Sequence, residues 1–316
     1  MKIILADCHG TVMGKDQSSA NLSLLYLAAY IRENAELEVE FRYIPQIKSD
    51  DYHLQLIKEF NPQIYAISFT SFSAVAAYEL IRRIKQQSPQ VLLVCGGVHT
   101  GFAYEEVLVK SGADIAVIGE GEQTFLEIVQ QCHRGVTNWR EIPGIAYLEN
   151  GICKKTATRP LIDDIDTIPF PARDLVNDSD FCGLSYSKSK SGTEMVVTRG
   201  CPLRCVFCAN PVFRLKNGPL FRSRSPENIA REAESLYKMG YREIYIHSDE
   251  LNVQLQWSID VCKALAALGH KDLFFQANLR VVPMSEEFAY WLKQANFWLV
   301  RIGLETCLLY TSPSPR

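Results

Sequence analysis

The sequence predicts an α/β protein in two parts, each built from alternating strands and helices. Short apolar runs of strand length alternate with segments of helical periodicity, first over residues 2–133 and again from residue 194 onward. A stretch rich in proline and glycine separates the two parts. Apolar strands joined by helices are typical of a parallel, doubly wound sheet, in which ligands lie beyond the carboxyl ends of the strands.

The first part has five apolar runs, and helical segments follow them in turn. Strands are expected at residues 2–6, 39–44, 64–69, 91–95 and 114–118. Helices are expected at residues 22–33, 53–60, 74–86, 104–110 and 122–133. We therefore expect a Rossmann-like, doubly wound domain over residues 1–135.

Residues 136–190 are predicted to form a linker, because turn-forming residues replace the regular pattern there. The pair Asn150-Gly151 predicts a hairpin, since both residues accept the positive backbone angles of a tight turn. Prolines at positions 160, 169 and 171 exclude a regular helix from the segment that follows.

The second part repeats the alternation over residues 191–307. Strands are expected at residues 194–199, 243–247, 273–279 and 298–305, and helices at 226–239, 255–268 and 286–295. Four strands are too few to close a barrel, so the sequence predicts a partial (β/α) barrel with an open edge. Residues 308–316, LLYTSPSPR, have no periodicity. We expect them to be a disordered or non-native tail of a truncated chain, whose turnover would be weak or absent.

Composition excludes several classes of protein. The chain has 316 residues, of which 47% are hydrophobic and 22% charged, as in soluble globular proteins. A net charge of −3 gives no electrostatic reason to expect a nucleic-acid partner. No apolar run is long enough for a transmembrane helix. The apolar run at the start of the chain is too short for the hydrophobic core of a signal peptide. We therefore expect a cytoplasmic protein whose ten cysteines are reduced thiols or metal ligands.

Three cysteines form the most informative motif. Cys201, Cys205 and Cys208 have C-x-x-x-C-x-x-C spacing directly after an expected strand. Soft thiolate ligands favour an iron–sulfur cluster or zinc. A structural zinc site needs four protein ligands, usually as two pairs, and no second pair follows. Cys182 is a possible fourth ligand, but 18 residues lie between it and Cys201. An iron–sulfur cluster is the favoured interpretation, with zinc or three unrelated core cysteines as alternatives.

The segment TRGCPLRCVFCANP resembles the cysteine loop of the radical S-adenosylmethionine (SAM) family. The resemblance implies that the three cysteines bind a 4Fe-4S cluster and leave one iron free to bind SAM. It further implies cleavage of SAM to a 5′-deoxyadenosyl radical, with the electron supplied by a donor such as flavodoxin or ferredoxin. Phe207 matches an aromatic position near the adenine of SAM, and simple core packing explains it equally well.

The same resemblance suggests further SAM contacts at the ends of the later strands. Ser248, Asp249 and Glu250 stand where the family often has Gly-Gly-Glu beside the methionyl amino group, although the glycines are missing here. Arg280 is a candidate partner for the methionyl carboxylate or a substrate anion, because guanidinium binds carboxylates in a bidentate manner. Glu305 is a candidate for the ribose. Ordinary surface charges remain the alternative for these residues.

Residues 1–135 resemble the cobalamin-binding domain that precedes many radical SAM cores. The matching stretches are NLSLLYLAAYIRE, AISFTSFSAVAAYELIRRIK, CGGVHTGFAYEEVL and GADIAVIGEGEQTFLEIV. After the cysteine loop, FRSRSPENIAREAESL resembles the corresponding segment of the same group. The resemblance therefore covers nearly the whole chain and implies cobalamin as a third cofactor.

Residues at the ends of the apolar strands are the candidate cobalamin contacts. They are Ser68, Thr70, Gly96, Gly97, Gly119 and Gly121, with His99 as a further candidate for the corrin. Glycines let a nucleotide tail approach the backbone, hydroxyls donate hydrogen bonds, and free amides at a helix start face an anionic or carbonyl-rich ligand. Tight turns are the alternative explanation for the glycines.

His9 is a candidate lower ligand of cobalt. Some cobalamin proteins use an Asp-x-His-x-x-Gly loop for this purpose, and Asp7-Cys8-His9 matches its first half. The match is incomplete because Val12 occupies the glycine position. A loop histidine beneath a cobalamin without a protein ligand is the alternative.

Together these features predict a cobalamin-dependent radical SAM enzyme acting on a small-molecule substrate. Methyl transfer to an unactivated centre is the favoured reaction, and a radical oxidative cyclisation of the tetrapyrrole type is the alternative. A non-catalytic cobalamin or redox sensor would bind the cofactors without cleaving SAM. A zinc-bearing structural protein with a flavodoxin-like domain is the third possibility.

Overall fold

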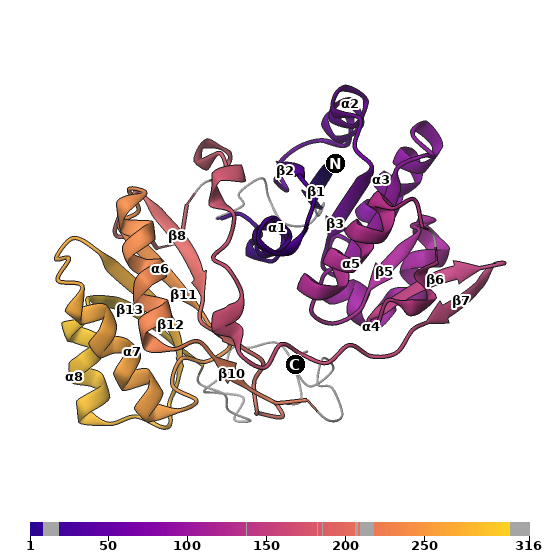
Figure 1. The fold of residues 1–316 in the computed structure, drawn as a ribbon. Helices are drawn as coiled ribbons and strands as arrows, with labels where there is room; N and C mark the ends of the chain where they lie inside the picture. Colours follow the sequence, from indigo (N-terminus) through magenta and orange to yellow (C-terminus); the bar gives the residue numbers. More distant parts are fainter. Residues whose placement is uncertain are drawn as a thin grey trace, which may run out of the picture. The chain divides into compact units, whose positions relative to one another are not determined.

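The computed structural model describes residues 1–8, 19–136, 138–181, 183–184, 186–205, 208 and 218–303. The chain forms two compact units (Figure 1). The amino-terminal unit comprises Met1–Ile162, Ile168–Cys182 and Leu215–Gly218, and the carboxy-terminal unit comprises Asp163–Thr167, Gly183–Arg214 and Pro219–Arg316.

The amino-terminal unit is built on a seven-stranded sheet in the order β2-β1-β3-β4-β5-β6-β7. Its strands are β1 (Lys2–Asp7), β2 (Glu40–Ile44), β3 (Ile64–Ser68), β4 (Leu92–Gly96), β5 (Ile115–Val117), β6 (Ile145–Glu149) and β7 (Ile152–Lys155). Strands β1 to β5 are parallel, which confirms the predicted doubly wound sheet. The order reverses between β1 and β3, so a ligand crevice is expected at their carboxyl ends.

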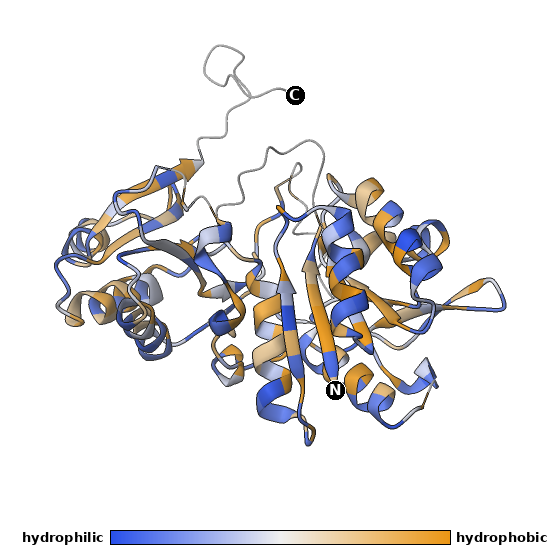
Figure 2. Ribbon diagram, turned by 90° about the horizontal axis from the view of Figure 1, so that it is seen from above, coloured by the Kyte–Doolittle hydropathy of each residue, from blue (hydrophilic) through white to orange (hydrophobic). Residues whose placement is uncertain are grey.

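Five helices cover this sheet on both faces. They are α1 (Leu22–Asn34), α2 (Asp50–Phe60), α3 (Ala74–Gln87), α4 (Val98–Ser111) and α5 (Glu122–His133). Helices α1 and α5 pack on one face, and α2, α3 and α4 on the other. Apolar colours run along the strands, whereas the helices show both hydrophobic and hydrophilic sides (Figure 2).

Two helices begin earlier than the sequence pattern predicts. Helix α2 begins at Asp50 because the Ser49 side chain accepts a hydrogen bond from the Tyr52 N–H and two aspartates occupy the first turn. Helix α4 begins at Val98 and has non-helical angles at Ala103, which separates its first turn from the regular part. The periodicity therefore revealed only the second part of α4.

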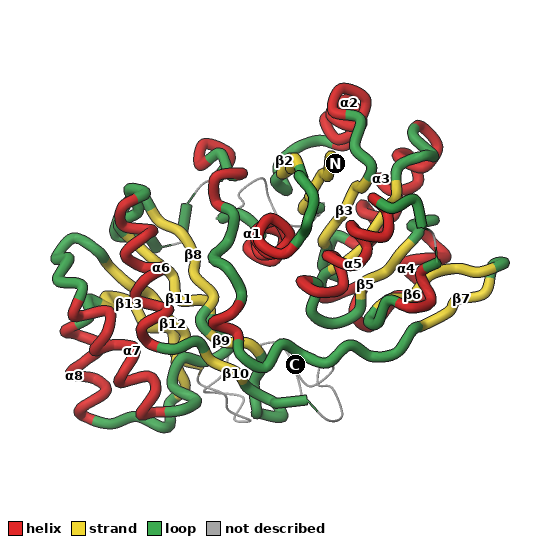
Figure 3. The backbone as a smooth tube through the Cα atoms, viewed as in Figure 1, coloured by secondary structure: helices red, strands yellow, loops and turns green. Residues whose placement is uncertain are grey.

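The expected hairpin forms at Asn150 and Gly151, whose φ values are 52° and 77°. Its first strand, β6, pairs antiparallel with β5, and β7 forms the edge of the sheet. The hairpin therefore extends the first sheet rather than lying within a separate linker. The following irregular stretch is drawn mainly as loop in Figure 3. Its described residues contain the short 3₁₀ helices η2 (Ile165–Thr167), η3 (Arg173–Leu175) and η4 (Asp178–Asp180), and η1 (Trp139–Glu141) precedes β6.

The carboxy-terminal unit contains a parallel four-stranded sheet in the order β13-β12-β11-β8. Its strands are β8 (Gly192–Val196), β11 (Glu243–His247), β12 (Phe274–Arg280) and β13 (Phe297–Gly303). Helices α6 (Pro226–Lys238), α7 (Leu255–Ala267) and α8 (Glu286–Gln294) cover one face (Figure 1). The four strands and three helices were predicted, and the described strands form an open sheet rather than a closed barrel.

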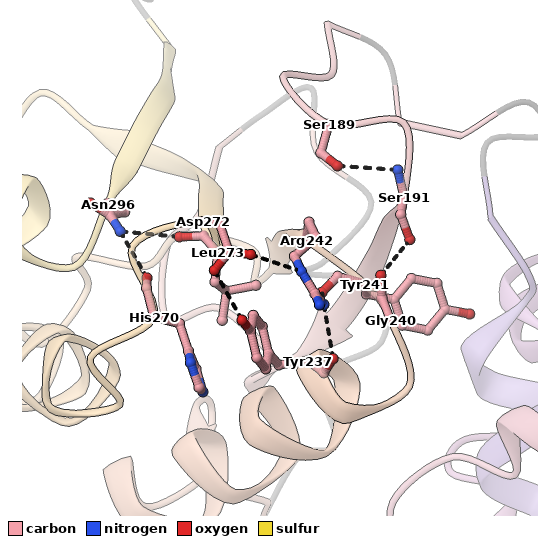
Figure 4. A network of polar contacts seen from close by, with 10 residues as sticks. All are labelled: Ser189, Ser191, Tyr237, Gly240, Tyr241, Arg242, His270, Asp272, Leu273 and Asn296. Carbon is pink, nitrogen blue, oxygen red and sulfur yellow. Dashed lines mark hydrogen bonds and ion pairs between the residues drawn. The ribbon is translucent and has the colours of Figure 1, made fainter.

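A network of polar contacts stabilises the amino ends of these strands. The Arg242 guanidinium lies 3.0 Å from the Asp272 carboxylate and 4.0 Å from the centre of the Tyr237 ring (Figure 4). The Tyr237 hydroxyl donates to the same carboxylate at 3.0 Å, which joins α6 to the segment before β12. The Asn296 side chain donates to the carbonyls of His270 and Leu273, both at 3.2 Å. This network lies at the opposite end of the strands from the cysteine segment.

A buried carboxylate, Glu243, adds to this end of the sheet. Its Oε2 accepts hydrogen bonds from the Ser187 hydroxyl and the backbone N–H groups of Lys188 and Ser189. Burial alone would raise the pKa of Glu243, but hydrogen bonds, chiefly from the Gln276 amide, hold it below its usual value. Glu243 is therefore an internal anchor of the sheet.

None of the helices within the described ranges is both long and apolar enough to cross a membrane.

Candidate functional sites at the carboxyl ends of the strands

The cysteine segment is a loop whose two stems pair with each other. Strands β9 (Thr198–Arg199) and β10 (Arg222–Ser223) form a short antiparallel ladder at its base. Gly200 follows β9 with a φ of +81°, and a Cβ there would lie 2.6 Å from the Leu220 carbonyl oxygen. Only glycine allows the stems to approach this closely, so the sequence closes the loop beside its first cysteine.

The three predicted cluster ligands differ in exposure. Cys201 is buried, Cys208 is partly buried and Cys205 is exposed. The backbone N–H of Cys208 donates to the Cys205 carbonyl at 3.1 Å. Burial raises the pKa of the Cys201 thiol, and the nearby charges of Asp249, Cys208 and Glu250 raise it further. These groups therefore share one electrostatic environment.

The donor chemistry of this loop fits an iron–sulfur cluster, because three thiols lie within eight residues of the sequence. Across the described part of the chain, no three His, Cys, Asp or Glu side chains are gathered closely enough to hold a metal ion. Metal binding would have to draw the three sulfur atoms together and would favour their thiolate forms.

Two buried hydroxyls beside the loop support a ligand at this edge. Ser248 follows β11 and is 3% exposed, and Thr198 in β9 is 5% exposed. The Val197 N–H donates to the His247 carbonyl at 3.3 Å, so the ends of these two segments are neighbours. Neither hydroxyl oxygen has a hydrogen-bond partner among the described residues. Buried polar atoms are rarely left unpaired, so this edge fits a polar ligand.

The end of β12 is fixed beside the end of β11. The Asn252 side chain accepts from the Arg280 N–H at 2.8 Å and donates to the Arg280 carbonyl at 3.0 Å. Within the described residues the Arg280 guanidinium makes no hydrogen bond or ion pair. The structure thus brings Arg280 to the predicted edge with its charge available. Asp249 and Glu250 follow Ser248 directly, whereas Phe207 and Glu305, two further predicted SAM contacts, lie outside the described residues.

Polar side chains on neighbouring strands contact one another across the open sheet, and the sequence did not predict these contacts. His247 Nδ1 in β11 lies 3.3 Å from the Glu194 carboxylate in β8, and this hydrogen bond raises the pKa of His247. The Arg301 guanidinium lies 5.1 Å from the centre of the Tyr245 ring and donates to the Gln276 side chain at 2.7 Å. The alternation of polar residues within these strands could have indicated these contacts. Side chains alternate between the two faces of a sheet, and the face that no helix covers stays polar.

In the amino-terminal unit, the ends of β1 and β3 are joined by a residue that the sequence did not single out. The Asn21 side chain donates to the Asp7 carboxylate at 3.3 Å and to the Ser68 hydroxyl at 3.4 Å. Asn21 also caps helix α1. It therefore fixes Ser68 at the predicted ligand edge. His9, the candidate cobalt ligand, lies outside the described residues.

The two glycines at the end of β4, Gly96 and Gly97, have different roles. Among the described residues, no atom would lie within 4 Å of a Cβ on Gly96, so the space beside it is open. Gly97 has a φ of +92°, and its Cβ would lie 2.7 Å from the Ser68 hydroxyl and 2.9 Å from the Phe69 carbonyl. The chain itself therefore requires glycine at position 97, whereas Gly96 leaves room for a ligand.

The remaining predicted contacts are spread along the same edge. Thr70 is exposed after β3, and its N–H donates to the Ser73 hydroxyl at 3.3 Å. Gly119 follows β5 with open space at its Cβ position, whereas a Cβ on Gly121 would meet the Leu27 side chain at 3.1 Å. Ser68 and Gly96 are register partners on adjacent strands, so these two residues lie side by side.

His99 is held within the protein by both ring nitrogens. Its Nδ1 lies 3.0 Å from the Ser71 hydroxyl and its Nε2 lies 2.8 Å from the Tyr78 hydroxyl. Burial lowers the pKa of His99, which favours the neutral form of the ring. Its ring also packs against Phe69 and Phe102. His99 therefore connects the start of α4 to the loop after β3.

Comparison with known proteins assigns a family to each unit. The B12 binding domain family matches residues 16–129, and the Radical SAM superfamily matches residues 195–308. An uncharacterized methyltransferase of Pyrococcus horikoshii is 31% identical over 301 residues, which covers 93% of this chain and 61% of that protein. An anaerobic magnesium-protoporphyrin IX monomethyl ester cyclase of Cereibacter sphaeroides is 26% identical over 259 residues, or 79% of this chain and 41% of the cyclase.

Two solved structures share the fold. The radical SAM methyltransferase TsrM from Kitasatospora setae, solved with tryptophan substrate and a SAM analogue, has a TM-score of 0.76 at 16% identity. The cobalamin-dependent SAM radical enzyme OxsB, solved with aqua-cobalamin and SAM, has a TM-score of 0.77 at 20% identity. Each alignment covers 96% of this chain, but only 59% of the TsrM chain and 44% of the OxsB chain.

Proposed function

The chain belongs to the family of radical SAM proteins that carry a B12-binding domain, and from this premise we propose that the protein is a cobalamin-dependent radical SAM methyltransferase. One observation carries the proposal: three cysteines occupy a closed loop at the carboxyl end of β8, in a chain that also contains a B12-binding domain. Active sites of strand–helix sheets lie at this end of the strands.

The residues at the two edges have separate tasks in this proposal. Cys201, Cys205 and Cys208 hold the 4Fe-4S cluster, and the unpaired hydroxyl of Ser248 and the guanidinium of Arg280 bind the polar methionyl end of SAM. Gly96 gives the cobalamin tail access to the backbone at the end of β4. Bound at these sites, the cluster supplies a single electron and the cobalamin supplies a transferable methyl group.

Methyl transfer is favoured over cyclisation by the relatives. The Pyrococcus horikoshii protein and TsrM are both named as methyltransferases. The cyclase of Cereibacter sphaeroides makes a radical oxidative cyclisation of the tetrapyrrole type the second candidate. Transfer of an isotope-labelled methyl group from SAM to a product supports the first reaction, and a product that gains no label supports the second.

We place the reaction in the cytoplasm, with a small-molecule substrate and an electron donor such as flavodoxin or ferredoxin. The cysteines of the described residues are free thiols, as expected in a reducing compartment. Incubation with SAM and dithionite after anaerobic reconstitution tests catalysis. Release of 5′-deoxyadenosine supports an enzyme, whereas cofactor binding without this product supports a sensor.

The cobalamin site can be tested at Gly96. Because the space beside it is open, a Gly96→Val variant should fold normally yet obstruct a ligand that lies against the backbone. We expect weaker cobalamin binding in absorbance titrations, with thermal stability and reconstituted iron content unchanged. Unchanged cobalamin affinity in the folded variant would remove Gly96 from the site.

A further inference from the structure

A buried ion pair stands directly behind the cysteine loop. Arg224, which follows β10, is 5% exposed, and Glu232 in α6 is 1% exposed. Arg224 Nη1 donates to the Glu232 carboxylate. Its Nε donates to the Asn228 side-chain oxygen at 2.7 Å, and its Nη2 donates to the Asn228 carbonyl at 3.3 Å. The guanidinium is thus fixed by several acceptors at once.

This arginine connects both stems of the loop. Arg224 Nη1 also donates to the carbonyl of Val196, the last residue of β8, at 2.8 Å. The Arg224 backbone N–H donates to the Val197 carbonyl at 3.0 Å. One residue on the returning stem therefore holds the outgoing stem through its side chain and through its backbone.

Neighbouring elements fix the returning stem in turn. The Trp257 indole N–H of α7 donates to the Arg224 carbonyl at 2.8 Å. The Ser225 N–H donates to the Asp166 carboxylate at 2.9 Å, and the Asn228 side chain donates to the Asp166 carbonyl at 3.4 Å. Arg224 therefore lies where α6, α7 and the end of β8 meet the cysteine loop.

The loop needs such an anchor because its own ladder is short. Among the described residues, the ladder between the stems has two residue pairs, Thr198–Ser223 and Arg199–Arg222, and residues 200–221 lie between them in the sequence. Closing a loop of this length reduces the entropy of the chain. The few hydrogen bonds of the ladder must offset that cost. Burying an arginine and a glutamate is itself unfavourable compared with a well-packed apolar pair of similar size. Stability of the unit alone therefore does not explain the pair.

We propose that Arg224 and Glu232 are positioning residues for the cysteine loop. They hold the stems in the register that directs the cysteines toward the end of β11, and so they control how firmly the cluster is retained. The inference rests on the proposed function, because it concerns the cluster that the cysteines would bind. It adds a role for two residues that touch neither the cluster nor SAM.

The test compares iron retention with folding. Reconstituted wild-type protein and the variants Glu232→Gln and Arg224→Met/Glu232→Leu are exposed to an iron chelator without oxygen, and iron release is followed by absorbance. The apolar double variant replaces the pair without leaving a buried charge, so it should remain folded. We expect both variants to release iron about tenfold faster or more, as when partners behind metal ligands are removed. Reduced samples should also show an altered EPR signal.

A matched control removes an arginine contact elsewhere in the same unit. Arg242→Lys disturbs the network at the opposite end of the strands (Figure 4) and should release iron at the wild-type rate. Folded variants that retain iron as firmly as the wild type would overturn the positioning role while leaving the proposed function intact. Wild-type protein that binds no iron would instead overturn the proposed function. If the double variant does not fold, Glu232→Gln, which changes a single atom, decides the matter.

Discussion

His53 is a buried base that can be used to test the packing of the amino-terminal unit. It is 1% exposed, and its Nδ1 lies 2.6 Å from the Tyr65 hydroxyl, which is itself buried in β3. Burial lowers the pKa of His53 to about 4. An unfolded histidine has a pKa near 6.5, so between these two values the unfolded chain binds more protons than the folded one.

We therefore predict that His53 makes the protein less stable in acid. Its contribution is complete above about pH 6.5 and is lost as the pH falls toward 4, by about 3 kcal/mol in total. A His53→Gln variant can form a hydrogen bond with Tyr65 in either direction but cannot titrate. Urea unfolding at pH 7 and pH 4.5 should show a smaller loss of stability for the variant. An identical loss in both proteins would show that His53 is not buried in its neutral form.

The contact between His247 and Glu194 on the open sheet can be tested by titration. The hydrogen bond that the Glu194 carboxylate accepts is the main cause of the raised pKa of His247. Glu194→Gln removes the negative charge, so the NMR titration midpoint of His247 should move to lower pH. The control Glu227→Gln removes an exposed charge at the start of α6 and should leave that midpoint unchanged. A His247 midpoint unaffected by Glu194→Gln would contradict the contact between β8 and β11.

At the scale of elements, the junction between β4 and α4 gives a direct test. Gly97 has a left-handed φ and no room for a Cβ beside Ser68 and Phe69. Strained backbone positions of this kind cost about 1–3 kcal/mol, and the steric contact adds to this. Gly97→Ala should therefore lower the free energy of unfolding measured in urea. Gly96→Ala is the matched control and should have little effect, because its side chain would enter open space. Equal effects of the two changes would contradict this geometry.

The sequence predicted elements well where local signals act alone. The five parallel strands of the first sheet follow from continuous apolar runs, and the Asn150-Gly151 turn follows from its residues. The early start of α4 was missed because non-helical angles at Ala103 interrupt the periodicity. Attachment of the hairpin to β5 was missed because pairing between strands is decided by the fold and not by the turn.

At the scale of the whole molecule, the alternation of strands and helices was sufficient to predict the fold class of both units. The spacing of Cys201, Cys205 and Cys208 was sufficient to locate the candidate cluster loop, since its signal lies within eight residues. The groups that fix the sites could not be predicted. Asn21, Arg224 and Asn252 act through partners distant in sequence, and only the folded chain brings these partners together.

The central claim is that these three cysteines hold an iron–sulfur cluster. The most direct test is the iron and sulfide content of the protein after reconstitution without oxygen. We expect about four of each per wild-type chain, and almost none after all three cysteines are replaced by alanine. A control with alanine at Cys132 and Cys153, which lie in the other unit, should retain the full content. A wild-type chain without iron and sulfide, or a triple variant that keeps them, would contradict the account.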